Sequence, residues 1–60
     1  MKVTVENLYG GKTDIFQGEP KQVKAQLFAT YKWIGNYGTN DLHEILKRLS
    51  EAQAYSVQVE

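Results

Sequence analysis

The one side chain of this sequence that could act as an acid–base catalyst near neutral pH is its single histidine, His43. Catalysis by histidine needs a nucleophile or a second acid–base group held beside it. His43 lies close to Asp41 and Glu44 in the expected first turn of a helix, and no serine or cysteine constellation surrounds it. We therefore expect His43 to be a solvated surface residue and the chain not to be an enzyme.

The carboxylates and glycines form no recognisable site for a metal or a cofactor. The seven Asp and Glu residues are spread over expected strand exteriors, turns and helix surfaces. Because the chain has no cysteine and only one histidine, it cannot form the thiolate or histidine clusters that bind zinc. Gly10-Gly11 precedes a strand, and Gly35 and Gly38 lack the Lys-Ser/Thr pair of a phosphate loop. We predict no catalytic residue, no metal site and no cofactor.

The pattern most suggestive of binding is a group of three lysines around one phenylalanine. Lys21, Lys24, Phe28 and Lys32 are spaced by three, four and four residues, so they share one face of a predicted helix. No acidic residue lies between positions 20 and 34. An exposed aromatic ring among cations can contact an acidic partner or stack on a nucleobase. In the alternative interpretation, Phe28 packs against the sheet edge or the second helix, and the lysines only keep the surface soluble.

The charge balance favours a protein partner over a nucleic acid. Seven basic and seven acidic side chains cancel, whereas dedicated nucleic-acid binders usually carry a positive excess. We expect a small non-catalytic interaction domain that binds a protein partner or itself. Its candidate partner-binding residues are Lys21, Lys24, Phe28 and Lys32. The alternative is a nucleic-acid-binding accessory protein that uses the same face, and no small-molecule substrate is implied.

Neither a membrane nor the secretory pathway is indicated. No apolar run approaches the roughly 20 residues of a membrane-spanning helix. Residues 1–6 contain no continuous apolar segment of the kind found in signal peptides. Because the lack of cysteine fits a reducing compartment, we expect a cytoplasmic protein.

Two kinds of hydrophobic periodicity predict the elements that position these residues. Alternation with a period of two predicts strands over residues 2–6 and 55–59, and Gly10-Gly11 predicts a hairpin to a strand over residues 12–16. An apolar stripe with helical spacing predicts a helix from Pro20 to a C-cap at Gly35. Thr39 or Asn40 is expected to cap a second amphipathic helix.

These elements predict one α+β domain over residues 1–60, with the order β-β-α-α-β and two helices packed on one face of a three-stranded sheet. The two terminal strands should lie side by side and, if the helices run antiparallel, should be parallel. Tyr31, Trp33 and Tyr37 are expected to complete the core, with a ligand or partner surface as the alternative. The other expected core residues are Val3, Val5, Ile15, Val23, Leu27, Ile34, Leu42, Ile45, Leu46, Leu49, Val57 and Val59.

The predicted sheet has two edge strands, residues 12–16 and 55–59. Edge strands pair with other chains unless proline, charge or a bulge blocks them. Neither strand contains proline, and flanking charges are few. Homodimerisation or addition of a partner's strand is therefore chemically open.

Overall fold

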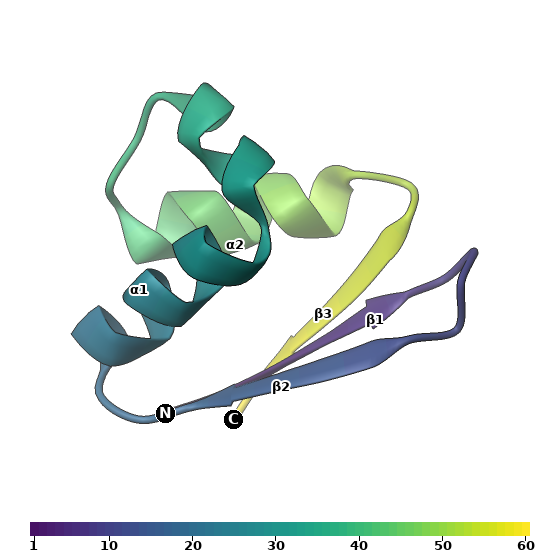
Figure 1. The fold of residues 1–60 in the computed structure, drawn as a ribbon, viewed down its shortest axis with the longest axis horizontal. Coiled ribbons are helices and arrows are strands. Elements are labelled where there is room, and N and C mark those ends of the chain that lie inside the picture. Colours follow the sequence, from purple (N-terminus) through teal and green to yellow (C-terminus); the bar gives the residue numbers. More distant parts are fainter.

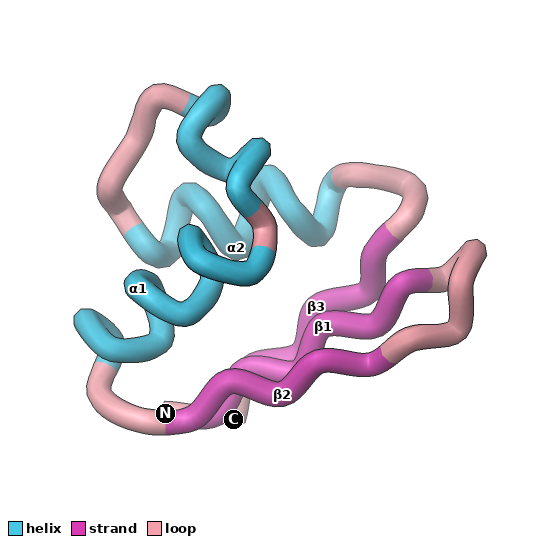
Figure 2. Tube along the Cα trace, viewed as in Figure 1, coloured by secondary structure: helices cyan, strands magenta, loops and turns pink.

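A computed structural model describes residues 1–60 and confirms the predicted α+β architecture, with helices covering one face of a three-stranded sheet (Figures 1 and 2). The two α-helices are joined by a 3₁₀ helix, η1, which the sequence pattern did not predict. The elements are β1 (Lys2–Asn7), β2 (Thr13–Gln17), α1 (Pro20–Thr30), η1 (Lys32–Tyr37), α2 (Leu42–Glu51) and β3 (Tyr55–Val59). Neither α-helix is long and apolar enough to cross a membrane.

The sheet has the strand order β2-β1-β3 and is antiparallel throughout. The prediction that the terminal strands lie side by side is confirmed. A parallel direction was expected only if the helices ran antiparallel. The strands are in fact antiparallel, since Tyr55 at the start of β3 lies opposite Asn7 at the end of β1. In Figure 1 the chain returns across the helical layer through η1 and the loop after it. Both α1 and α2 therefore run toward the hairpin end of the sheet, where β3 begins.

The strand register decides which side chains meet the helices. Val3 lies opposite Phe16 on β2 and Val59 on β3, so these three side chains share the covered face of the sheet. Ile15 lies opposite Thr4 on the uncovered face and is 58% exposed. The expected core position of Ile15 is therefore wrong, and Phe16 takes that place.

The core joins the covered face of β1 and β2 to both α-helices and η1. Its ten buried residues are Val3, Val5, Phe16, Val23, Leu27, Tyr31, Ile34, Ile45, Leu46 and Leu49. Leu42 and Val57 are only half-buried, although they pack against this core. Val59, also expected in the core, is 54% exposed. The three residues that fall short of full burial all lie between α2 and β3, where the covering is incomplete.

The helix ends differ from those predicted. The first α-helix ends at Thr30, because Tyr31 leaves helical geometry at φ −115° and ψ 82°. Gly35 lies inside η1, and Gly38, at φ 70°, is the left-handed residue that ends it. A spacing of three between apolar residues suits a 3₁₀ helix as well as an α-helix, so the stripe could not distinguish them.

The second α-helix begins one residue later than the predicted caps allow. Its N-cap is Asp41, whose carboxylate accepts a hydrogen bond from the backbone N–H of His43 at 3.1 Å. Thr39 instead accepts from the backbone N–H of Asp41 through its hydroxyl oxygen, also at 3.1 Å. A carboxylate at the N-cap both satisfies a free helix N–H and suits the positive end of the helix dipole.

Candidate interaction surfaces

The structure does not keep the four predicted partner-binding residues on one helix face. Lys21, Lys24 and Phe28 lie on α1, whereas Lys32 lies in η1, after the α-helix has ended. The ammonium group of Lys24 donates to the backbone carbonyl of Asn40 at 3.1 Å, which ties α1 to the loop before α2. Phe28 is half-buried and packs against the core. Lys21 and Lys32 are exposed, and a partner contact by this face stays a prediction.

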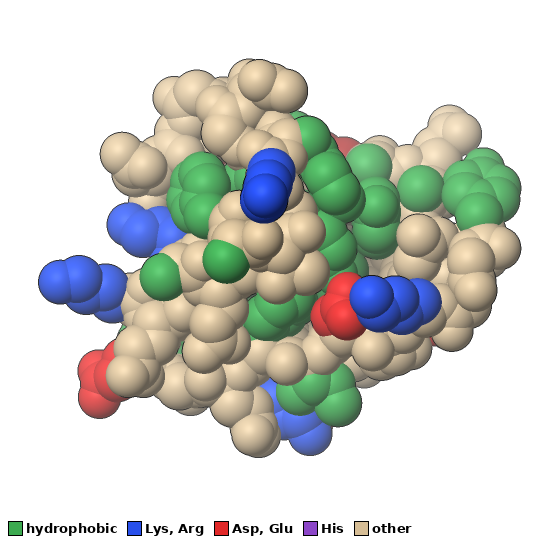
Figure 3. Space-filling model, viewed as in Figure 1, with side chains coloured by type: hydrophobic (Ala, Val, Ile, Leu, Met, Phe, Trp, Pro, Cys, Tyr) green, Lys and Arg blue, Asp and Glu red, His purple; other side chains and the backbone are tan.

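Basic side chains on the visible face form separate groups and no continuous patch (Figure 3). Lys12 forms an ion pair with Asp14 on β2, with 4.0 Å between the ammonium nitrogen and a carboxylate oxygen. A nucleic-acid surface usually gathers its basic residues on one face to neutralise neighbouring phosphates. On this face, the arrangement of basic side chains does not support the nucleic-acid alternative.

The free edge of β3 carries backbone N–H and C=O groups that have no hydrogen-bond partner in the chain. Lys2 and Glu60 exchange both of their backbone hydrogen bonds, at 3.1 and 2.8 Å. Hydrogen-bonded and non-hydrogen-bonded pairs alternate along an antiparallel ladder, so Gln58 also bonds to β1. Val57 and Val59 consequently direct their N–H and C=O groups away from β1. These four backbone groups have no partner within the chain.

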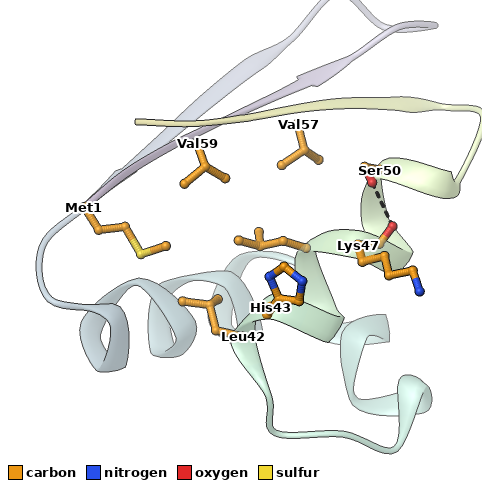
Figure 4. Close-up of a pocket in the computed structure, with 8 residues that line it drawn as sticks. Met1, Leu42, His43, Lys47, Ser50, Val57 and Val59 are labelled. Carbon is orange, nitrogen blue, oxygen red and sulfur yellow. Dashed lines mark hydrogen bonds between the residues drawn. The ribbon is translucent and has the colours of Figure 1, made fainter.

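A groove of about 640 Å³ lies between the free strand β3 and α2 (Figure 4). Its apolar lining consists of Met1, Leu42, Leu46, Val57 and Val59. Figure 4 shows Val57 and Val59 pointing from β3 toward α2, so their side chains line the groove while their backbones form the free edge. His43, Lys47 and Ser50 from α2 complete the lining.

The opposite edge of the sheet, at β2, is less open. The side-chain amide of Gln26 on α1 donates to the backbone carbonyl of Gln17 at 3.3 Å. The side chain of Ile15 points to the uncovered face of the sheet, away from the helices. The free backbone groups of β2 therefore have no apolar groove beside them, in contrast to those of β3.

Tyr31, Trp33 and Tyr55 form a packed aromatic cluster beside β2. The ring centroids of Tyr31, Trp33 and Tyr55 lie 5.0 to 6.0 Å apart, which is contact distance for aromatic rings. Tyr31 is buried as expected, whereas Tyr37 is only half-buried against the core. The expected core position of Trp33 is wrong, because Trp33 is 41% exposed. A cavity of about 220 Å³ beside the cluster is lined by polar and aromatic side chains in similar number. The three rings line this cavity and contact one another directly.

Tyr31 connects the helical layer to β2 through a hydrogen bond. Its hydroxyl donates to a carboxylate oxygen of Asp14 at 2.6 Å. Burial of the ring, the hydrogen bond to Asp14 and the negative charge of that carboxylate raise the pKa of Tyr31 well above its ordinary value of 10.0. The neutral phenol is therefore the form that the folded chain stabilises.

The Tyr31→Phe variant should be less stable than the wild type by about 1.5–3 kcal/mol at neutral pH, the usual contribution of a hydrogen bond to a charged group. The raised pKa of Tyr31 stabilises the fold fully below pH 10.0, and this contribution is lost as the pH rises further. The stability difference between wild type and variant should therefore shrink above pH 10.0. Urea denaturation at a series of pH values measures it. A difference that stays constant above pH 10.0 would contradict the assigned bond.

His43 lies on the rim of the groove and is exposed. Of the other seven lining residues, five are apolar, and the hydroxyl of Ser50 already donates to the backbone carbonyl of Lys47 at 2.8 Å. No group of three or more His, Asp or Glu side chains is placed to hold a metal ion. The sequence pattern did not reveal that His43 adjoins a groove, since this depends on the position of α2 over β3.

Comparison with known proteins gives no relative from which a function could be transferred. No protein-family model matches the chain, and neither a curated protein nor a solved structure is significantly similar to it.

Proposed function

We propose that this chain is a small non-catalytic interaction domain, which binds an extended segment of a protein partner, or of a second copy, along β3. The observation that carries the proposal is the coincidence of a free strand edge with an apolar groove. Val57 and Val59 contribute to both, through their backbones and their side chains respectively.

Strand addition uses the two features together. In this binding mode, main-chain hydrogen bonds supply affinity, and alternate side chains of the added strand enter neighbouring pockets and supply specificity. A strand added beside β3 would place alternate side chains on the same sheet face as Val57 and Val59, and hence in the groove. An occupied groove would also bury Val59, which is 54% exposed in the free chain. The lack of cysteine fits action in the reducing cytoplasm, where we place the domain.

The proposal is tested by selecting ligands from a random-peptide display library on the immobilised wild-type chain. Selected peptides should shift the backbone amide resonances of Val57 and Val59 in a ¹⁵N-labelled sample. They should bind Val59→Lys about tenfold more weakly, because an ammonium group beside the apolar groove costs at least about 1–3 kcal/mol when a ligand covers it. Sedimentation equilibrium of the chain alone measures self-association at the same edge.

Ile15→Lys provides the matched control. Ile15 also lies in an edge strand and is 58% exposed, but its side chain is on the uncovered face of the opposite edge. This variant should bind the selected peptides like the wild type. A selection that yields no specific peptide, or peptides that bind Val59→Lys and wild type equally, would overturn the proposal.

A further inference from the structure

The ionisable side chains at the rim of the β3 groove are all basic. Lys47 and His43 are its ionisable residues, and no acidic side chain lines the groove. The three ion pairs of the chain involve Lys2, Lys12 and Arg48. Lys47 belongs to none of them and is exposed. Its ammonium group is therefore free to meet a negative charge brought by a ligand.

The register of β3 defines which positions of an added strand enter the groove. The strand residues opposite Val57 and Val59 would form hydrogen-bonded pairs, since the free N–H and C=O groups belong to these two residues. Their side chains would lie between β3 and α2, next to Leu42 and Leu46. The residue between them would point to the other sheet face, beside the polar Gln58. The groove thus fits an apolar–polar–apolar segment.

A second copy of the chain is a poor occupant of this groove. Pairing two β3 strands about a two-fold axis would bring the two copies of α2 together, because α2 packs over β3. Each α2 would present the same rim with its unpaired Lys47 to the other. Like charges placed opposite each other disfavour association, whereas an acidic ligand would be attracted.

From the free edge, the groove and its basic rim, we infer that the ligand is an extended peptide segment of another protein. It has apolar side chains at two alternate positions and a carboxylate at a flanking groove-facing position, next to Lys47. This inference rests on the proposed function, because it specifies the ligand of the same edge.

Two synthetic peptides test the inference. Both have alternating valine and threonine at their centre, and they carry either glutamate or lysine at each end. Titration of the ¹⁵N-labelled chain should show the glutamate peptide shifting Val57 and Val59 amides, with a dissociation constant about two- to fivefold lower than that of the lysine peptide. This is the range for one exposed ion pair. Lys47→Glu should reverse the preference.

Lys12→Glu is the charge-matched control, because it changes the net charge equally but lies exposed just before β2, outside the groove lining and outside the predicted lysine–phenylalanine face. It should keep the wild-type preference for the glutamate peptide. Equal affinities of the two peptides at β3, or a preference that Lys47→Glu leaves unchanged, would overturn the charge inference and leave strand addition standing. If neither peptide moved the β3 amides, the inference and the proposed function would both fall. If the free chain dimerised through β3, the inference that the ligand belongs to another protein would be wrong, whereas strand addition at β3 would stand.

Discussion

Leu49→Ala is expected to lower the free energy of unfolding by about 2–5 kcal/mol. Leu49 is fully buried on the face of α2 that meets the core, so its truncation leaves a cavity that the surrounding side chains only partly fill. Folded domains are typically stable by about 5–15 kcal/mol, and a chain of this size has a small core. A large share of the molecules should therefore be unfolded under mild conditions. Urea denaturation followed by circular dichroism measures the loss.

The control for Leu49 is Ile15→Ala, which truncates an aliphatic side chain that the structure leaves 58% exposed. Its effect should stay within about 0.5 kcal/mol, as is usual for surface substitutions. The comparison also tests the register of β2, because the sequence pattern had placed Ile15 in the core. Equal destabilisation by the two variants would show that β2 is shifted by one residue.

The part of the fold that the sequence predicted is the part that local periodicity determines. Val3 and Val5 alternate with polar residues, and Ile45, Leu46 and Leu49 of α2 recur at helical spacing, so these residues were identified correctly as core. In β2 the neighbours Ile15 and Phe16 are both apolar, and periodicity alone does not decide which faces inward. The pairing of Phe16 with Val3 decides it. The direction of β3 likewise depends on the return of the chain through η1.

The candidate site was harder to predict, because it consists of the free edge of β3 and the open groove between β3 and α2, which the helices do not cover. The sequence showed that β3 could be an edge strand without proline, and this much was anticipated. It did not show that Val57 and Val59 would lie beside Leu42 and Leu46 across an open groove, since these residues are distant in sequence. The prediction of a lysine–phenylalanine face required one continuous α-helix through Lys32. The α-helix ends at Thr30, so Lys32 is not part of that face.

Phe28→Ala is expected to destabilise the fold by about 2–3 kcal/mol, less than the roughly 3–5 kcal/mol typical of a fully buried phenylalanine. The reason is that Phe28 is half-buried and packs against the core from α1. Its loss would remove apolar contacts on the side of α1 that Lys24 holds to Asn40. Thermal and urea denaturation measure the effect. Peptides selected on the wild-type chain should bind the folded variant with unchanged affinity.

Substitution of the three lysines near Phe28 distinguishes a structural role of this face from a role in binding. A variant with Lys21, Lys24 and Lys32 all changed to glutamine should stay folded, losing about 0.5–1.5 kcal/mol with the bond from Lys24 to Asn40. Because the free edge and the groove lie on β3 and α2, this variant should bind the selected peptides like the wild type. The opposite pattern would be a Phe28→Ala variant as stable as the wild type, together with a lysine variant that no longer binds. That result would place the partner on α1, and β3 would then be an edge without a ligand.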